Sequence, residues 1–203
     1  MNYGQVRDQV LKLLNQYTIA GATVENSYNN QQDYLERIPC LVNDAMLEIA
    51  TTARKIPTTL NLGDLVQEDL DKQVRYELPG NFYQFVSGSV VKTLDGRILH
   101  TNCYTFQGHK FLILPKEEAG NYTLTYYRYP VPLADKPLDT DELDNEPETH
   151  YAIASYVAGH LLAHDDMALS AMYHNSYEDK LAKMGPGITA EVHRVEDAYH
   201  FFG

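Results

Sequence analysis

The spacing of the apolar residues changes twice along this chain of 203 residues, and this change restricts the fold more than any other feature. Towards both ends, apolar residues recur every three to four positions, which is typical of helices with a buried face. Between residues 73 and 133, Tyr, Val, Thr, Phe and Ile dominate and turn signals recur, which is typical of β-strands. The pattern predicts an α+β fold: a helical bundle with an inserted antiparallel β region and a C-terminal arm.

The first 72 residues are predicted to supply the N-terminal helices of the bundle. The apolar spacing predicts a first helix over residues 3–18, with Asn2 as its N-cap. It predicts a second helix over residues 34–56. Pro39 should kink or restart this helix, and Pro57 should end it.

Residues 73–134 are predicted to form the β insert. Asp95-Gly96 between two apolar pairs is a strong hairpin signal, and residues 122–129 carry the clearest strand pattern. The gaps between the strands are too short for a crossover helix, so the sequence predicts an antiparallel meander. Prolines after residue 129 end the region.

Residues 135–184 are predicted to hold an acidic loop and the long C-terminal helices of the bundle. The helical pattern runs from Pro147 to Met184, and Asp165-Asp166 should divide it into two helices. The first of these is apolar around its whole girth, which predicts a central helix covered by its neighbours.

The C-terminal residues 185–203 are predicted to form a hinge and an arm. The apolar residues of the arm follow a helical spacing, and a Gly-Pro-Gly sequence separates them from the rest of the chain. Such a segment can fold back on its own core or dock on another subunit. We favour docking, because exposed apolar surfaces of this size usually mark contacts. The hinge residues are Gly185, Pro186 and Gly187, and the candidate docking residues are Ile188, Val192, Val195, Tyr199, Phe201 and Phe202.

Half of the formal net charge of −12 lies in one segment. Residues 135–148 contain seven acids and one base, which is typical of a solvated acidic loop. The spacing of Asp139, Asp141 and Asp144 weakly resembles a calcium loop, but the central Gly and the closing Glu of such a loop are missing.

The charge and the apolar runs also exclude several classes of protein. A chain this acidic repels phosphates, which disfavours non-specific nucleic-acid binding by the whole protein. No apolar run has the length of about 20 residues that a membrane span needs. The N-terminus lacks the basic and then apolar pattern of a secretory signal. We therefore expect neither a membrane partner nor secretion.

Catalytic motifs are missing from the sequence. It contains no P-loop, no dinucleotide fingerprint and no Gly-x-Ser-x-Gly elbow. The sharpest enzymatic candidate is His164-Asp165 with His160 one turn earlier, because two imidazoles at this spacing can share a metal ion. A third ligand is missing, so packed or interface histidines are the favoured interpretation. The sequence predicts no catalytic residue, no metal site and no cofactor; a metal-dependent phosphohydrolase is the enzymatic alternative.

The order and spacing of four segments, rather than any single motif, indicate a resemblance to a known family. The segments are residues 42–50, residues 76–82 (Tyr-Glu-Leu-Pro-x-x-Phe), residues 124–130 (Leu-Thr-Tyr-Tyr-Arg-Tyr-Pro), and the helical segment with Pro147, Glu148, His150, Tyr151, Ala152, Ile153, Tyr156, Leu161, Leu162, Asp165, Asp166, Ala168, Ala171, Tyr173, Tyr177 and Leu181. Together they resemble the head-to-tail adaptor (head-completion or connector) proteins of tailed bacteriophages. The resemblance covers residues 35–184 and does not extend to the first helix, residues 3–18.

The resemblance implies a structural virion protein without enzyme activity. Such proteins form a ring, typically of twelve subunits, that sits under the portal protein, extends the DNA channel and joins the capsid to the tail or to a stopper protein. In relatives a C-terminal arm often engages the portal, which makes the candidate docking residues above the expected portal contacts. Double-stranded DNA would pass through the channel without specific binding, repelled by negative walls. The candidate acidic residues of the channel or loop surface are Asp139, Asp141, Glu142, Asp144 and Glu146.

The resemblance also implies a location in the virion, at the head–tail junction, after synthesis in the cytoplasm of the bacterial host. Another neck protein, such as a tail terminator or a stopper, is the structural alternative. Those proteins often form six-membered rings and are usually richer in strands. The long helical pattern of residues 147–184 favours the adaptor.

Overall fold

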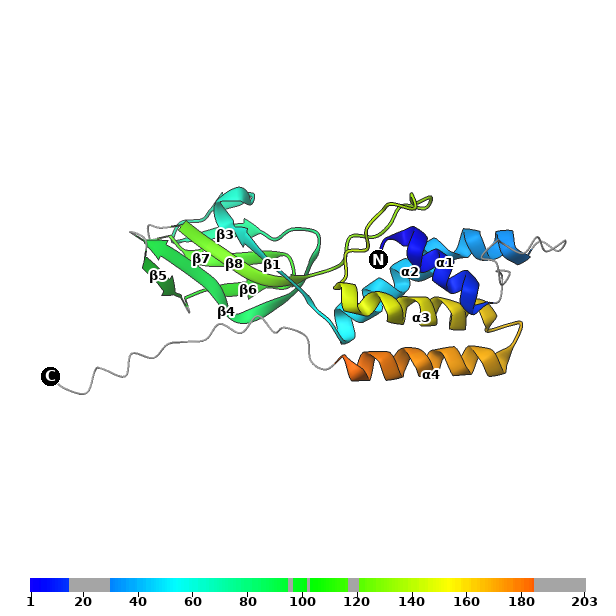
Figure 1. Cartoon of the computed structure of the whole chain (residues 1–203). Coiled ribbons are helices and arrows are strands. Elements are labelled where there is room, and N and C mark those ends of the chain that lie inside the picture. Colours follow the sequence, from blue (N-terminus) through cyan, green and yellow to red (C-terminus); the bar gives the residue numbers. More distant parts are fainter. Residues whose placement is uncertain (15–29, 95–96, 102, 117–120, 185–203) are drawn as a thin grey trace, which may run out of the picture. The chain divides into compact units, whose positions relative to one another are not determined.

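The computed structural model describes residues 1–14, 30–94, 97–101, 103–116 and 121–184 of the chain. These residues divide into two units (Figure 1). The helical unit comprises residues 1–56 and the described chain from residue 129 onward, and the β unit comprises residues 57–128. The predicted hinge and docking arm, residues 185–203, lie outside the described residues.

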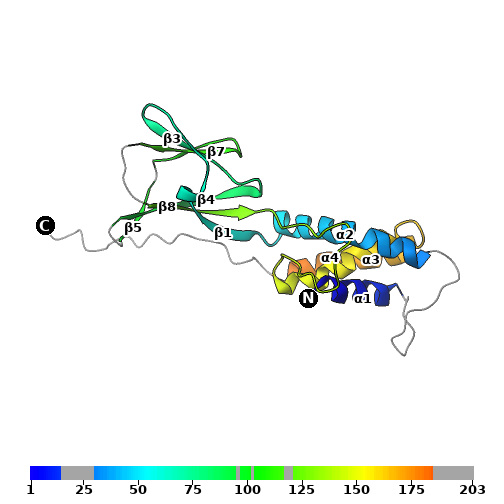
Figure 2. The same ribbon diagram turned by 90° about the horizontal axis from the view of Figure 1, so that it is seen from above.

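The helical unit, as far as it is described, contains four α-helices, three of which pack around the fourth. They are α1 (Tyr3–Leu13), α2 (Asn30–Thr52), α3 (His150–Leu162) and α4 (Met167–Lys183), with the short 3-10 helix η2 (Pro147–Thr149) before α3. Helix α3 contacts α1, α2 and α4 (Figures 1 and 2). Its Ile153 and Val157 are fully buried. This confirms the predicted central helix, since apolar residues all round let each neighbour cover one face. None of the described helices combines the length and the apolar character that crossing a membrane requires.

Two helix starts follow local signals in the sequence. Asn2 and Gln5 form a capping box at α1: the Asn2 side chain accepts from the Gln5 N–H (3.0 Å), and the Gln5 side chain accepts from the Asn2 N–H (3.1 Å). Asp166 caps α4 by accepting two backbone N–H bonds of its first turn, at 3.0 Å each. The predicted division of the C-terminal helical segment at Asp165-Asp166 is therefore confirmed. The predicted restart at Pro39 and the predicted bounds 34–56 are wrong: helix α2 runs from Asn30 through Pro39 to Thr52, and Ile56 begins β1.

The β unit consists of two four-stranded antiparallel sheets, with strand orders β1-β8-β4-β5 and β2-β3-β7-β6. The strands are β1 (Ile56–Asn61), β2 (Gln67–Asp69), β3 (Gln73–Glu77), β4 (Phe82–Leu94), β5 (Arg97–His100), β6 (Thr105–Gln107), β7 (Phe111–Pro115) and β8 (Asn121–Arg128), and the 3-10 helix η1 (Leu62–Asp64) follows β1. One hydrophobic core takes side chains from both sheets, including Val90 and Leu124 from the first and Leu112 and Leu114 from the second. The β unit therefore has a core of its own.

Two features of β4 follow from its sequence. It pairs antiparallel with β5, with Leu94 opposite Arg97, which confirms the hairpin predicted at Asp95-Gly96. Its register with β8 shifts between Phe85 and Val90, where Gly88 has a φ of 69°. Glycine adopts this conformation without the steric cost that a Cβ brings, so the β-bulge falls where the sequence permits it.

The predicted fold class is wrong. The β part is not a meander inserted into a helical bundle, but a strand-rich unit of two sheets, with the α-helices confined to the two ends of the described chain. Neither sheet follows the order of the chain, because β8 lies between β1 and β4, and β7 lies between β3 and β6. Pairing between strands so distant in sequence leaves no trace in the local spacing of apolar residues, which reports only the type of each element.

Candidate interaction surface

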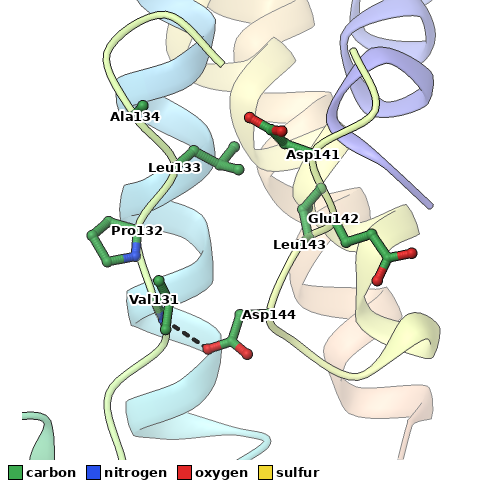
Figure 3. Close-up of a pocket in the computed structure, with 8 residues that line it drawn as sticks. All are labelled: Val131, Pro132, Leu133, Ala134, Asp141, Glu142, Leu143 and Asp144. Carbon is green, nitrogen blue, oxygen red and sulfur yellow. Dashed lines mark hydrogen bonds between the residues drawn. The ribbon is translucent and has the colours of Figure 1, made fainter. Parts of the chain in front are cut away.

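An irregular segment of the helical unit carries the acidic residues that the sequence singles out. We call residues 129–146, between β8 and η2, the acidic strap. The strap has two legs. The outgoing leg, with residues 131–134, lies beside α2, and the returning leg, with residues 141–144, lies nearer α1 (Figure 3). A cavity of about 390 Å³ lies between the legs. Leu133 and Asp141 point into it, and Glu142 points away from it (Figure 3).

One asparagine of α2 fastens the outgoing leg. The Asn43 side chain donates to the Leu133 carbonyl (3.0 Å) and accepts from the Leu133 N–H (2.8 Å). These two bonds satisfy both backbone groups of a residue that lies in no helix or strand. The Leu133 side chain packs against the hydrophobic core of the helical unit, so polar and apolar contacts fix the leg at the same position.

The returning leg closes over the start of α1. The first N–H groups of a helix have no partner within the helix. Here the Tyr3 N–H donates to the Asp141 carbonyl (2.8 Å), and the Gly4 N–H donates to the Asp139 carbonyl (3.0 Å). Gly4 permits this approach, because a Cβ there would lie 2.9 Å from the Asp139 Cβ and 3.0 Å from its carbonyl oxygen. The strap thus supplies the partners that the helix end lacks.

Four of the five predicted acidic residues form hydrogen bonds or ion pairs within the protein through their carboxylates. Asp139 pairs with Arg7 (2.5 Å), Asp141 accepts from the Leu138 N–H (2.9 Å), Asp144 accepts from the Val131 N–H (2.7 Å, Figure 3), and Glu146 lies 3.7 Å from Arg54. The fifth, Glu142, is exposed. The acidic segment is an irregular and largely exposed loop, as its charge predicts, and most of its carboxylates also bind groups of the protein.

The pKa of Arg7 reflects this pairing. Burial lowers the pKa of the guanidinium, but hydrogen bonds to Asp8 and Asp139 outweigh burial and raise it overall. Arg7 therefore stays charged, and it offsets part of the negative charge of the strap at Asp139.

Arg54 joins three segments of the helical unit, and the sequence analysis did not identify it. It lies just after α2, is 7% exposed, and donates to the Met184 carbonyl at the end of α4 (2.5 Å). Its guanidinium also lies 3.7 Å from Glu146 and 3.4 Å from Glu148. A cation is favoured at the C-terminal end of a helix, where the macrodipole is negative. The nearest of these partners in sequence is about ninety positions away, so no local pattern could reveal the contact.

The histidines considered as metal ligands lie in two different environments. The His160 ring in α3 packs against Tyr156 (4.3 Å between centroids) and against His174 of α4 (4.7 Å). Burial, and then the neighbouring His174, lower the pKa of His160. His164 and Asp165 lie in the turn after α3, where Asp165 accepts from a tyrosine hydroxyl of α2 (2.7 Å). Within the described residues, no group of three or more His, Cys, Asp or Glu side chains is placed to hold a metal ion.

Comparison with known proteins identifies a family. A family model described as "SU10 adaptor protein" matches residues 1–197. The match includes the first helix, which lay outside the resemblance drawn from the sequence. No curated protein matches the chain.

Proposed function

Because the chain belongs to the SU10 adaptor protein family, a phage head-to-tail adaptor family, we propose that copies of it form a ring between the portal and the tail. The match over residues 1–197 carries this proposal and confirms the resemblance found in the sequence. The protein is a structural bacteriophage adaptor. The proposed ring has twelve copies, lies in the neck of the virion, and contacts the portal on one side and a tail or stopper protein on the other.

In this ring, the acidic strap is the proposed surface that faces passing DNA. Each copy carries a formal charge of −12, and negative walls repel phosphates, so a duplex would pass without specific binding. The hydrogen bonds of the strap to Asn43 of α2 and to the start of α1 support this role, since they attach its backbone to the helical unit. Glu142 is the best candidate to face DNA, because it is exposed and points away from the strap cavity (Figure 3). Asp139 and Glu146 are weaker candidates, because Arg7 and Arg54 partly neutralise them.

Portal docking is assigned to the C-terminal arm, with Gly185, Pro186 and Gly187 as its hinge. The support is the apolar stripe of the arm in the sequence, together with the bond from Arg54 to the Met184 carbonyl. That bond holds the residue that precedes the hinge. No catalytic step is part of the proposal: the protein acts by fitting between its neighbours.

Assembly on the portal tests the proposal. The full chain is mixed with the portal protein of the same phage, and the complex is studied by light scattering and electron microscopy. A twelve-membered ring on the portal is expected. A chain that stays monomeric and never binds the portal contradicts the proposal, and a six-membered ring contradicts the proposed copy number.

Truncation after Met184 tests the arm separately. The truncated chain should fail to dock on the portal, while its far-UV circular dichroism keeps the signal of the described helices. Normal docking of the truncated chain would contradict the role assigned to the arm.

A further inference from the structure

β5 is an edge strand whose outer side is uncovered in the part of the protein that the structure describes. It pairs on one side with β4 and lies at the end of the first sheet. Its neighbouring residues Ile98 and Leu99 point to opposite faces of the sheet, yet they are 69% and 45% exposed. An edge with unpaired backbone groups and exposed apolar side chains on both faces is suited to pairing with another strand.

The other edges of the two sheets carry features that oppose pairing. The start of β1 contains Pro57, β2 has exposed Glu68 and Asp69, and β6 is three residues long with exposed Thr105 and Gln107. Proline, charge and short length are the usual ways in which proteins protect an edge. β5 contains no proline and no acid, and its one exposed charge, Arg97, stands at its first position, so Ile98 and Leu99 remain as an unprotected apolar edge.

The opposite end of the same sheet offers a segment of matching length. β1 is the edge strand there, and Pro57 removes a backbone donor only at its start. Within residues 58–61, the backbone groups that point away from β8 can pair with another strand, and β5 is also four residues long. Strands alternate in direction through an antiparallel sheet, so β5 of one copy laid against β1 of another continues the alternation. This arrangement brings the start of β5 to the end of β1.

Opposite charges lie at these two ends. Arg97 is the first residue of β5, and Asp64 follows β1 by three positions, at the end of η1. Both are exposed, and neither has an ion-pair partner among the described residues. Copies with a net charge of −12 repel each other, so a cation facing an acid is what a contact between copies requires.

We propose that β5 of one copy pairs with β1 of the next copy, so that the first sheet of the β unit continues from subunit to subunit around the ring. This inference rests on the ring assembly proposed above. The partner is a second copy, because a closed ring needs two different and complementary surfaces on each subunit, and the two ends of one sheet provide them. Pairing of β5 with another β5 would use the same surface twice and would give a closed dimer instead.

Two lysine substitutions in the full chain, each assembled on the portal, test the inference. Ile98→Lys places a charge on the β5 edge. Leu70→Lys places the same charge on an apolar residue of the β unit that is also exposed, at 36%, and that follows β2 of the other sheet, outside the proposed contact. Ile98→Lys should raise the concentration needed for half-maximal ring formation by about tenfold or more, which corresponds to the loss of one central interface residue. Leu70→Lys should leave that concentration unchanged, as measured by mass photometry and electron microscopy.

A charge exchange gives an independent measurement. Arg97→Glu and Asp64→Arg should each weaken ring formation, and the double variant should restore it, because the ion pair is formed again with reversed polarity. The inference is overturned by normal rings with Ile98→Lys, by failure of the double variant to restore assembly, or by closed dimers in place of rings. A wild-type chain that forms no ring on the portal would instead overturn the proposed function on which the inference rests.

Discussion

The helical unit is closed by contacts between residues far apart in the sequence, whereas the β unit is built from one continuous stretch of chain. Arg54 and Met184 are 130 positions apart, and the Tyr173 hydroxyl donates to the Leu13 carbonyl (2.7 Å) across 160 positions. The β unit lies wholly within residues 57–128 as far as it is described. The helical unit therefore depends on both ends of the chain, and the β unit depends on its own residues alone. This difference predicts that the two units respond separately to substitution.

The largest effect is expected from Ile153→Ala in the centre of α3. Ile153 is fully buried, and truncation of such a side chain costs about 2–5 kcal/mol of unfolding free energy. Because α3 contacts the other three helices, the whole helical unit should lose stability while the β unit keeps its own. Urea unfolding, monitored by hydrogen exchange with mass spectrometry, measures the stability of each unit separately.

Leu124→Ala is the matched variant for the β unit, since Leu124 is equally buried in the other core. It should lower the stability of the β unit and spare the helical unit. If each variant destabilises both units together, the chain unfolds as one body and the comparison fails.

Arg54→Met should have the next largest effect, because it removes the contact that links the ends of α2 and α4. The Met184 carbonyl loses its donor, while Glu146 and Glu148 can be solvated, so a cost of about 1–3 kcal/mol is expected. Hydrogen exchange should accelerate at the end of α4 and in η2. Arg37→Met removes an exposed pair with Asp33 and is the control, with an expected cost below about 0.5 kcal/mol. Equal costs for the two variants would argue against a special role for Arg54.

Local signals predicted the starts of α1 and α4 and the hairpin, and long-range contacts decided the rest. The cap at Asn2, the division at Asp165-Asp166 and the hairpin of β4 and β5 each depend on a few neighbouring residues, so the sequence displays them directly. The order of strands in the two sheets depends on which distant segments meet, and β1 and β2 were not anticipated at all. The sequence therefore predicted the type of most elements and missed the architecture of the β unit.

The acidic strap shows the same difference between local signals and long-range contacts. The charge run identified the acidic strap, because composition alone reveals it. The residues that hold the strap in place are Asn43, Gly4 and Arg54, and no local pattern indicates this role for them, although Asn43 lies in the segment 42–50 that carries the family resemblance. Their roles arise from chain segments that meet only in the folded helical unit, which is why sequence analysis could not find them.

Gly4→Ala tests how closely the strap is packed on α1. The new methyl group would lie 2.9 Å from the Asp139 Cβ, so the strap must move away from α1. This movement weakens its hydrogen bonds to the first N–H groups of the helix. Such overpacking costs about 1–3 kcal/mol, measurable by thermal unfolding. Gly63→Ala in the β unit is the control, because no atom lies within 4 Å of the added methyl group. It should be neutral or stabilise by up to about 1 kcal/mol, and an equal loss in both variants would contradict close packing at Gly4.

The smallest effect concerns pH and should be confined to the helical unit. His150 is 3% exposed, and burial lowers the pKa of its imidazole, partly offset by its hydrogen bond to the Asn145 carbonyl (3.0 Å). Above the usual histidine pKa of about 6.5, the ring is neutral in both the folded and the unfolded chain, and its contribution to stability is complete. As pH falls through that value, the unfolded chain takes up a proton that the folded chain refuses, so the free energy of unfolding decreases. The decrease ends once pH passes the lowered pKa of the folded state.

His150→Gln should remove this part of the acid sensitivity, because glutamine can still donate to the Asn145 carbonyl but does not titrate. The variant and the wild type are unfolded with urea at pH 7.5, 6.5 and 5.5. The wild-type helical unit should lose at most about 1.4 kcal/mol per pH unit more than the variant, since one proton is involved. The β unit of the two proteins should show identical pH dependence. An equally steep loss in the variant would assign the acid sensitivity of the helical unit to other groups, and a difference that appears in the β unit would show that the two units are coupled.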